Sequence, residues 1–432
     1  MKRLLTTIIT LSLLSCAQPK QRYYTQHVTF PEGTTAEQKI DMAAHVVPSD
    51  KQFAWQELEL TAFIHFGINT FTDSEWGSGT EDPALFNPTA LDCEQWVTTL
   101  KKGGFEMVIL TAKHHDGFCL WPTETTEHSV VHSPWREGKG DVVRELSEAC
   151  RKHDMKFGFY LSPWDRNAAS YGDSPAYNKF FIAQLTELLT KYGKIGAIWF
   201  DGYWDQRHNA EKFDWGLDEQ YAMIHRLQPD CLIGNNSHIA AHPGEDFQIF
   251  ERDLPGENKA GYSDGQEVTN YLPLETCQTM NKSWGYVVKD TDYKSLEVLI
   301  RYLVSTSGKG ANLLLNIGPQ PNGELPAAAL ERLKGMGEWM RKYGDTIYGT
   351  TAGDIPAQDW GVTTRKGDRL FVHIFNLKEK TLTLNLKAKV TAAKAFDGGK
   401  AVAFSQSGES VTLTFDEVPS GTDYIVELTT EK

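Results

Sequence analysis

Short apolar runs alternate with amphipathic stretches along most of this chain. Between about residues 58 and 345 the runs are a few residues long, and the stretches between them have helical spacing. This alternation is typical of βα units that build a parallel sheet. Strands are predicted at Leu60–Phe66, Phe105–Thr111, Lys156–Leu161, Ile195–Phe200, Cys231–Gly234, Phe247–Phe250 and Ala311–Ile317. A weaker eighth strand is expected at Glu275–Met280 or within residues 266–273, so the pattern predicts an α/β fold, an irregular (β/α)8-type barrel.

The same pattern marks helix ends and a second domain. Asp92 can cap a helix that carries Trp96 and Leu100 and stops at Gly103, and Asp141 can cap another. After residue 348 helical spacing disappears, and alternating segments are separated by glycine-containing turns. We expect a catalytic barrel at residues 51–348 and a small antiparallel β-sandwich at residues 349–432, with strands at Leu370–Phe375, Thr381–Leu386, Val411–Phe415 and Tyr424–Leu428.

The start of the chain predicts export. A basic Lys2 and Arg3 precede the apolar Leu4–Leu14, which is too short to span a bilayer and matches a secretory signal. The run ends in Ser15-Cys16, similar to a bacterial lipobox, in which Cys16 would be lipidated; the alternative is an ordinary cleaved signal. Residues 1–16 are interpreted as a lipoprotein-type signal peptide and residues 17–50 as a tether and lead-in segment. We therefore expect a periplasmic or outer-membrane-attached bacterial lipoprotein, which contacts the membrane only through this N-terminal anchor.

Charge and cysteine content narrow the possible partners. The net charge is −14, whereas nucleic acids and anionic membrane surfaces demand a basic face, so no nucleic-acid partner is expected. The cysteines other than Cys16 are widely spaced and form no Cys-x-x-Cys pair, which predicts neither a disulfide framework nor a zinc site. A neutral substrate fits this composition best.

Polar residues gather where the predicted strands end. The apolar run before Asp201 ends in this carboxylate, and barrels place their chemistry at the carboxyl ends of parallel strands. The alternative is an Asp that only caps the following loop. His65 closes the first strand, His114 and His115 follow the second, and Asp165 follows the third. Because neighbouring side chains alternate, one of the adjacent histidines is expected to face the mouth while the other supports it.

Histidines and acids on one rim predict sugar chemistry. Three histidines beside aromatic side chains favour hydrogen bonds to ligand hydroxyl groups. A metal site is the alternative, but the His-x-His spacing of metal-dependent barrel hydrolases is absent, so no metal is predicted. Hydrolysis of a sugar needs two carboxyl groups with opposite tasks. Asp201 is one candidate; Glu251, which closes another strand, and Glu275 compete to be its partner.

The runs at these strand ends are similar to those of a known family. They are Phe63–Gly67, Leu110–Phe118, Trp199–Gly202, Ser283–Tyr286 and Leu313–Pro319. Together, in this order and from about residue 55 to 345, they resemble glycoside hydrolase family 29, the α-L-fucosidases. The run Lys113-His114-His115-Asp116-Gly117-Phe118 is the most specific of them.

The resemblance implies a retaining exo-α-L-fucosidase that needs no cofactor and releases terminal L-fucose from a fucosylated oligosaccharide or glycoconjugate. Asp201 matches the family nucleophile. Glu251 is assigned as the acid/base, with Glu275 in reserve, because an Arg that some members place upstream has no counterpart in Gly234–Asn236. The positions that surround the fucose in the family match His65, Glu75, Trp76, His114, His115, Tyr160, Trp199 and Trp284. The alternatives are a catalytically silent surface glycan-binding lipoprotein on the same fold and a metal-dependent hydrolase.

Overall fold

Eight parallel strands form a closed barrel in chain order. The structure, a computed structural model, describes residues 30–44, 49–203, 213–269 and 271–431. The barrel closes because β1 pairs with both β2 and β8. Its strands are β1 Leu60–Ile64, β2 Met107–Lys113, β3 Lys156–Leu161, β4 Ala197–Phe200, β5 Leu232–Asn235, β6 Phe247–Glu251, β7 Leu274–Thr279 and β8 Ala311–Ile317. The predicted barrel is confirmed, and β7 occupies the first of the two positions expected for the weak strand.

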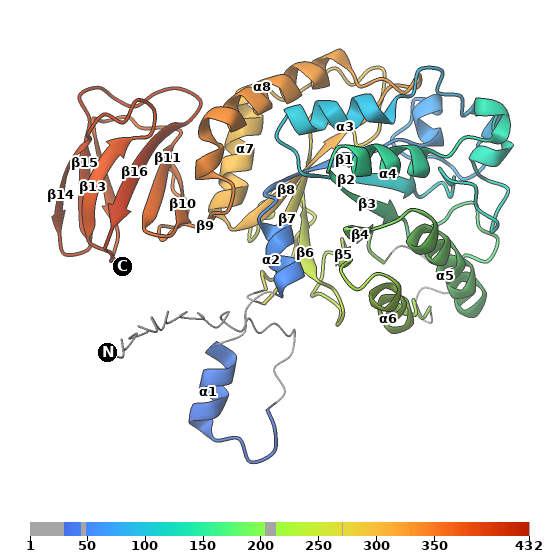
Figure 1. Ribbon diagram of the computed structural model, residues 1–432, viewed down its shortest axis with the longest axis horizontal. Coiled ribbons are helices and arrows are strands. Elements are labelled where there is room, and N and C mark those ends of the chain that lie inside the picture. The colour runs from blue at the N-terminus through green and yellow to red at the C-terminus, as the bar shows by residue number, and fades with distance from the viewer. Residues whose placement is uncertain (1–29, 45–48, 204–212, 270, 432) are drawn as a thin grey trace, which may run out of the picture.

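Helices surround the barrel (Figure 1). The backbone nitrogens of Gln95 and Arg144 donate to Asp92 and Asp141 at 3.0 and 2.8 Å, so both predicted caps are confirmed. No helix separates β5 from β6 or β6 from β7 in the described parts of these connections, which makes the barrel irregular. The helices are α2 Asp50–Gln56, α3 Cys93–Lys102, α4 Val142–Lys152, α5 Ser174–Lys191, α6 Leu217–Leu227, α7 Leu296–Gly308 and α8 Ala327–Tyr343, with 3-10 turns at Ile68–Thr72, Pro83–Leu85, Val130–His132, Trp135–Gly138 and Gly344–Thr346.

Side-chain alternation fixes which residues reach the mouth of the barrel. Trp199 of β4 belongs to the interior core, whereas its neighbour Ile198 packs in the outer core. Trp55 of α2 closes the amino end of the barrel, where its ring stacks on that of Phe247 with centroids 4.5 Å apart. Asp201 continues the inward series of β4 and therefore lies at the open, carboxyl end.

A β-sandwich follows the barrel, as predicted. One sheet has the order β13-β16-β11-β10-β9 and the other β12-β15-β14. Both sheets contribute to one core, with Leu370 and Leu428 from the first and Leu384 and Val411 from the second. The strands are β9 Thr351–Ala352, β10 Gly361–Lys366, β11 Arg369–Ile374, β12 Thr381–Asn385, β13 Val390–Ala395, β14 Ala403–Ser407, β15 Ser410–Thr414 and β16 Tyr424–Thr430.

The sandwich is fastened to the barrel through α7 and α8, which lie between the two parts (Figure 1). Arg301 of α7 donates to the backbone carbonyls of Phe375, Gly421 and Thr422 at 3.0, 2.9 and 2.7 Å. Phe371 of β11 packs in the same apolar core as the barrel helices. The two parts are thus joined by both apolar contact and hydrogen bonds.

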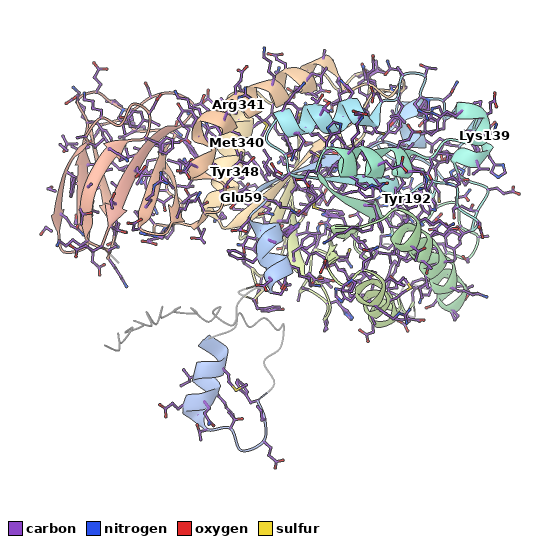
Figure 2. All side chains as sticks on the ribbon, viewed as in Figure 1. Glu59, Lys139, Tyr192, Met340, Arg341 and Tyr348 are labelled. Atoms are coloured by element: carbon purple, nitrogen blue, oxygen red, sulfur yellow. The ribbon has the colours of Figure 1, made fainter. Side chains whose placement is uncertain are left out.

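A close approach at Gly104 ties the end of α3 to this junction. Gly104 has a φ of 91°, and a Cβ there would lie 3.1 Å from the Tyr348 hydroxyl and 3.2 Å from Met340 Cβ. The Tyr348 hydroxyl donates to the Gly104 carbonyl. Figure 2 shows Met340 and Tyr348 where α8 meets the sandwich. Only glycine tolerates both this backbone conformation and these neighbours.

The N-terminal segment is described only in part. Residues Ala36–Ala44, within the predicted tether, form helix α1. The predicted signal peptide and the lipidation site at Cys16 lie outside the described residues. In the part of the chain that is described, no helix is both long and apolar enough to cross a membrane.

Candidate active site

One cavity at the carboxyl end of the barrel gathers the predicted site residues. Its volume is about 480 Å³. It is lined by Asp201, Glu251 and all eight side chains matched to positions around fucose, together with Phe63, Asn236, His238, Arg252, Tyr262, Lys282 and Ser283. A second cavity of about 570 Å³ opens where strands begin, at Met107, Lys156 and Leu232, and holds none of the predicted residues. Because barrels carry their chemistry at the carboxyl ends of strands, the first cavity is the candidate site.

Asp201 is held by two donors at the bottom of this cavity. The Tyr160 hydroxyl donates to Oδ2 at 2.8 Å and Asn236 Nδ2 donates to Oδ1 at 3.0 Å. Burial, and then the negative charge of Glu251, raise the pKa of Asp201 to about 6, although the two hydrogen bonds lower it. The carboxyl group is therefore ionised above about pH 6, in a fixed orientation, with its charge poorly solvated.

Asn236 joins Asp201 to Glu251. Its Nδ2 also donates to Glu251 Oε2 at 2.8 Å. Because one nitrogen bonds to both groups, Asp201 Oδ1 and Glu251 Oε2 lie no more than about 5.8 Å apart, the sum of the two bond lengths. Glu251 Oε2 also lies 3.4 Å from His238 Nε2, and His238 Nδ1 donates to the Tyr262 carbonyl at 2.7 Å. The two carboxyl groups thus share one cavity but differ in their other partners.

Glu275 lies deeper in the barrel. It is paired with Ile249, whereas Glu251 is paired with Cys277, so Glu275 sits two residues closer to the amino end. It is fully buried and accepts a hydrogen bond from Trp199 Nε1 at 2.9 Å, while its Oε2 has no partner among the described residues. Burial raises the pKa of Glu275 to about 8. Glu275 therefore carries a proton at neutral pH and supports Trp199 instead of lining the cavity.

Three neutral histidines stand in the cavity wall. Burial lowers the pKa of His65, His114 and His115, that of His114 to about 3. His115 Nδ1 lies 2.7 Å from Ser162 Oγ, which itself donates to the Trp164 carbonyl. On its other side, His115 Nε2 lies 3.4 Å from Asp201 Oδ2, so the ring spans the space between Ser162 and the Asp201 carboxyl group. Neutral imidazoles, each with a donor and an acceptor nitrogen, suit hydroxyl groups better than charges.

A register shift in the pairing of β2 with β3 precedes His114 and His115 and affects which side chains face the cavity. The pairing of β2 with β3 slips between Thr111 and Lys113, which turns the Lys113 side chain out of the barrel. His114 and His115 then both line the cavity, so the expectation that only one would face it is wrong. The physical reason is that β2 ends at Lys113, and strand alternation does not extend to the residues after it.

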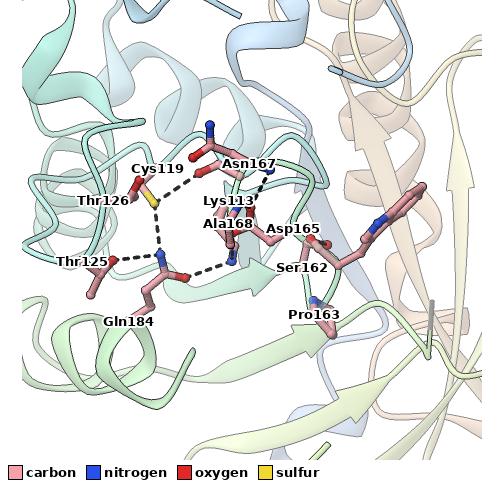
Figure 3. Close-up of polar contacts among 12 residues, drawn as sticks. Lys113, Cys119, Thr125, Thr126, Ser162, Pro163, Asp165, Asn167, Ala168 and Gln184 are labelled. Carbon is pink, nitrogen blue, oxygen red and sulfur yellow. Dashed lines mark hydrogen bonds and ion pairs between the residues drawn. The ribbon is translucent and has the colours of Figure 1, made fainter. Parts of the chain in front are cut away.

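The outward Lys113 fixes the loop that contains Asp165 (Figure 3). Its Nζ lies 2.9 Å from both Asp165 Oδ2 and Gln184 Oε1, with the lysine and aspartate side chains almost fully buried. Asp165 Oδ1 accepts from the Ala168 backbone nitrogen at 2.7 Å. The ring of Trp164 is thereby held with its centroid 4.9 Å from that of His115. Asp165, predicted at the rim, serves this loop and does not line the cavity.

The cavity also offers polar atoms without protein partners. Glu75 Oε2, His114 Nδ1 and Asn236 Oδ1 are buried and have no hydrogen-bond partner among the described residues. Glu75 Oε1 accepts from the Trp284 backbone nitrogen at 2.8 Å, which fixes that wall. Unpaired buried polar groups beside aromatic rings are the features expected of a site for a small ligand with hydroxyl groups and an apolar face.

One grouping in this site has the composition of a metal site. His114, His115 and Asp201 bring possible ligand atoms within 4.8 Å of one another, and within the described ranges no other group of three does so. Both oxygens of Asp201 already accept hydrogen bonds from Tyr160 and Asn236. This arrangement favours a carboxylate held for chemistry over one held as a ligand.

Several lining residues escaped sequence analysis. Asn236 directly follows β5, so the strand-end rule that singled out Asp201 would have found it. His238 and Tyr262 lie in the helix-free connections around β6. The course of such loops leaves no periodic signal in the sequence, so nothing in the pattern indicated that they reach the cavity.

An eight-stranded parallel barrel with two carboxyl groups, neutral histidines and aromatic walls at its carboxyl end has the architecture of a glycoside hydrolase. Comparison with known proteins agrees and is more specific. The sequence pattern of the alpha-L-fucosidase family matches residues 29–345. The chain belongs to this family.

Individual relatives support the assignment. The chain is 39% identical over 310 residues to alpha-L-fucosidase 1 of Arabidopsis thaliana. The matched region covers 68% of this chain and 60% of that relative. It is 32% identical over 347 residues to the plasma alpha-L-fucosidase of Rattus norvegicus, covering 74% and 70%. The structure of alpha-L-fucosidase isoenzyme 1 from Paenibacillus thiaminolyticus matches with a TM-score of 0.75 and 29% identity, over 89% of this chain and 99% of that one. The chain thus spans less than two thirds of its plant relative.

Proposed function

We propose that this protein is an exo-acting retaining α-L-fucosidase, with Asp201 as nucleophile and Glu251 as acid/base. The shared Asn236 nitrogen carries the proposal, because it keeps the nearest carboxyl oxygens within about 5.8 Å. Retaining glycosidases hold their two carboxyl groups about 5 to 5.5 Å apart, and inverting ones about 6.5 to 9.5 Å apart. This upper limit is consistent with the retaining separation and lies below the inverting range, which supports the proposal.

In the first step, Asp201 attacks the anomeric carbon of a terminal α-L-fucosyl group. The bond between that carbon and the leaving oxygen breaks, Glu251 gives its proton to this oxygen, and a covalent fucosyl-enzyme forms. In the second step, Glu251 accepts a proton from a water molecule, whose oxygen attacks the anomeric carbon and releases Asp201. The product is fucose of the original configuration.

The cavity walls suit L-fucose in two respects. The sugar is a 6-deoxyhexose, so it presents several hydroxyl groups and one methyl group. The neutral rings of His65 and His114 and the unpaired Glu75 Oε2 are available to hydroxyl groups, and the neutral His115 ring lies in the same wall. The rings of Phe63, Trp199 and Trp284 offer apolar surface to the methyl group. The expected substrates of the protein are therefore fucosylated oligosaccharides or glycoconjugates.

The nucleophile is tested by Asp201→Gly with an aryl α-L-fucoside. The rate should fall by several orders of magnitude, and azide should restore part of it by replacing the missing carboxylate. Asp359→Gly, at an exposed carboxylate of the sandwich, is the matched control and should keep wild-type activity. Near wild-type activity in Asp201→Gly would contradict the assignment.

The acid/base is tested by the dependence on the leaving group. Glu251→Ala should slow substrates with poor leaving groups far more than activated aryl fucosides, because a good leaving group needs no protonation. Glu275→Ala should show no such dependence, since Glu275 does not line the cavity. The opposite pattern would transfer the role to Glu275.

Two rival functions have distinct signatures. A glycan-binding lipoprotein that has lost turnover would bind fucosides without hydrolysing any of them. A metal-dependent hydrolase would use the grouping of His114, His115 and Asp201, and would lose activity in a chelator and regain it with added metal. Neither is favoured, because the positions of Asp201 and Glu251 in one cavity support the retaining pair proposed above.

We also propose that the protein is exported and anchored to a bacterial membrane through Cys16, on the strength of the N-terminal sequence. Cys16→Ser should remove the lipid and release the protein from the detergent phase on phase separation. Equal partition of the variant and the wild type would argue for an ordinary cleaved signal.

A further inference from the structure

The wall of the cavity beside Glu251 contains two residues that the recognition of fucose leaves unused. His238 Nε2 lies 3.4 Å from Glu251 Oε2, and His238 Nδ1 donates to the Tyr262 carbonyl at 2.7 Å. The centroids of the His238 and Tyr262 rings are 5.8 Å apart. Tyr262 is 44% exposed, although it lines the cavity. The three residues form a row that leads from the acid/base outward to solvent.

The backbone beside this row is unusual. His238 and Arg252 both have a φ of 60°, in the left-handed region that few residues other than glycine adopt. Such conformations gather at functional sites, where the surrounding structure holds them in place. Here they flank Glu251: Arg252 follows it directly in the chain, and the His238 ring reaches its carboxyl group.

Another part of the wall near Glu251 is built by Arg252 and Trp284. Arg252 Nη2 donates to the Lys282 carbonyl at 2.8 Å, and the Arg252 guanidinium lies over the Trp284 ring at 5.0 Å. The Trp284 backbone is in turn tied to Glu75. Arg252 and Trp284 are thus tied to the loop at Lys282 and to Glu75, whereas the exposed Tyr262 ring is open to a ligand that extends beyond the fucose.

The chemistry then fixes where the rest of the substrate lies. An acid that protonates a leaving oxygen must be within hydrogen-bond reach of it, so the leaving group starts at Glu251. Building on the proposed fucosidase activity, we infer that Tyr262 and His238 form a subsite for the sugar unit to which fucose is attached in the substrate. The exposed aromatic ring suits the apolar C–H face of a neutral pyranose. The substrate class is thus fucose linked to a second sugar ring.

The experiment compares two substrates in the full-length enzyme. α-L-Fucosyl fluoride has a leaving group without a ring, whereas a fucosylated disaccharide has a pyranose at the inferred subsite. In Tyr262→Ala, kcat/KM for the disaccharide should fall about tenfold more than kcat/KM for the fluoride, the scale of one aromatic stacking contact. Tyr262→Phe keeps the ring and should behave as wild type. Val268→Ala, an exposed side chain in the same connection that does not line the cavity, is the matched control.

The outcomes separate the subsite from the activity. A selective loss in Tyr262→Ala that Tyr262→Phe does not share supports the subsite. An equal loss on both substrates, or no loss on either, overturns it while the fucosidase activity stands. If the wild type hydrolyses neither compound, the proposed function itself fails, and the subsite with it.

Discussion

Replacing Glu275 by Gln should stabilise the protein at neutral pH. Glu275 is fully buried in the barrel, accepts one hydrogen bond from Trp199 Nε1, and has a pKa raised to about 8 by burial. Gln has almost the same shape and can accept the same indole hydrogen bond. Unlike Glu, it carries no charge in the unfolded chain. The substitution therefore removes a titration and little else.

The expected gain in unfolding free energy follows from the coupling between folding and protonation of Glu275. The ordinary pKa is 4.5, so at pH 7 the unfolded chain has Glu275 ionised while the folded protein holds it protonated. Because the folded pKa is the higher one, the native state has its full stability below about pH 4.5 and loses it as the pH rises towards 8. At about 1.4 kcal/mol per pH unit, the loss at pH 7 is about 3 kcal/mol. Glu275→Gln should recover up to this amount.

Urea titrations of the wild type and Glu275→Gln between pH 4.5 and 7.5 would measure this difference. The gain in unfolding free energy should shrink towards zero near pH 4.5. Glu409→Gln, at an exposed carboxylate of the sandwich, should show no such trend. A gain independent of pH, or a loss at pH 7, would refute the burial argument. Glu275→Gln should also keep hydrolysing substrates with poor leaving groups.

Three further predictions concern the site and its support. Since the pKa of Asp201 is raised to about 6 and a nucleophile must be ionised, the acidic limb of kcat/KM should rise with pH up to about 6; a pH–rate profile checks this. Asn236→Ala removes a donor to the Asp201 carboxylate, so the acidic limb of that profile should move to higher pH. Lys113→Met leaves Asp165 buried without its partner and should cost about 3 to 5 kcal/mol in denaturant unfolding, whereas the double variant with Asp165→Asn should lose less.

Most of the barrel was predictable because its strands are buried on both faces. Runs such as Ala197–Phe200 are apolar throughout and bounded by turn residues, which is a strong local signal. The weak strand β7, Leu274–Thr279, carries Glu, Thr and Gln at buried positions, so its pattern is polar although its environment is not. Its neighbours β6 and β8 supply the pairing that the local sequence does not indicate.

The sandwich was only half predictable for a related reason. The predicted strands contain β-branched and aromatic residues, whereas two of the four unpredicted strands, β13, Val390–Ala395, and β14, Ala403–Ser407, are rich in Ala and Ser. Segment β14 is stabilised as a strand by its ladder with β15, Ser410–Thr414. Pairing between segments, which sequence periodicity does not record, decides their structure.

The candidate site shows the same division between local and non-local information. Strand-end position was enough to bring His65 and Asp201 into one cavity with Glu251. It could not show that a slip in the pairing of β2 turns Lys113 outward, nor that His238 and Tyr262 arrive from helix-free loops. These features depend on how distant segments meet.

The choice between Glu251 and Glu275 rests on depth in the barrel. Both lie on inward-facing positions of neighbouring strands, so alternation alone cannot separate them. Glu251 is the last residue of β6 and reaches the cavity, where Asn236 and His238 contact it. Glu275 is the second residue of β7, below Trp199, and does not line the cavity. An acid/base must exchange its proton with substrate and water in each cycle, so the site favours Glu251, and Glu275 keeps its proton as a support for the aromatic floor.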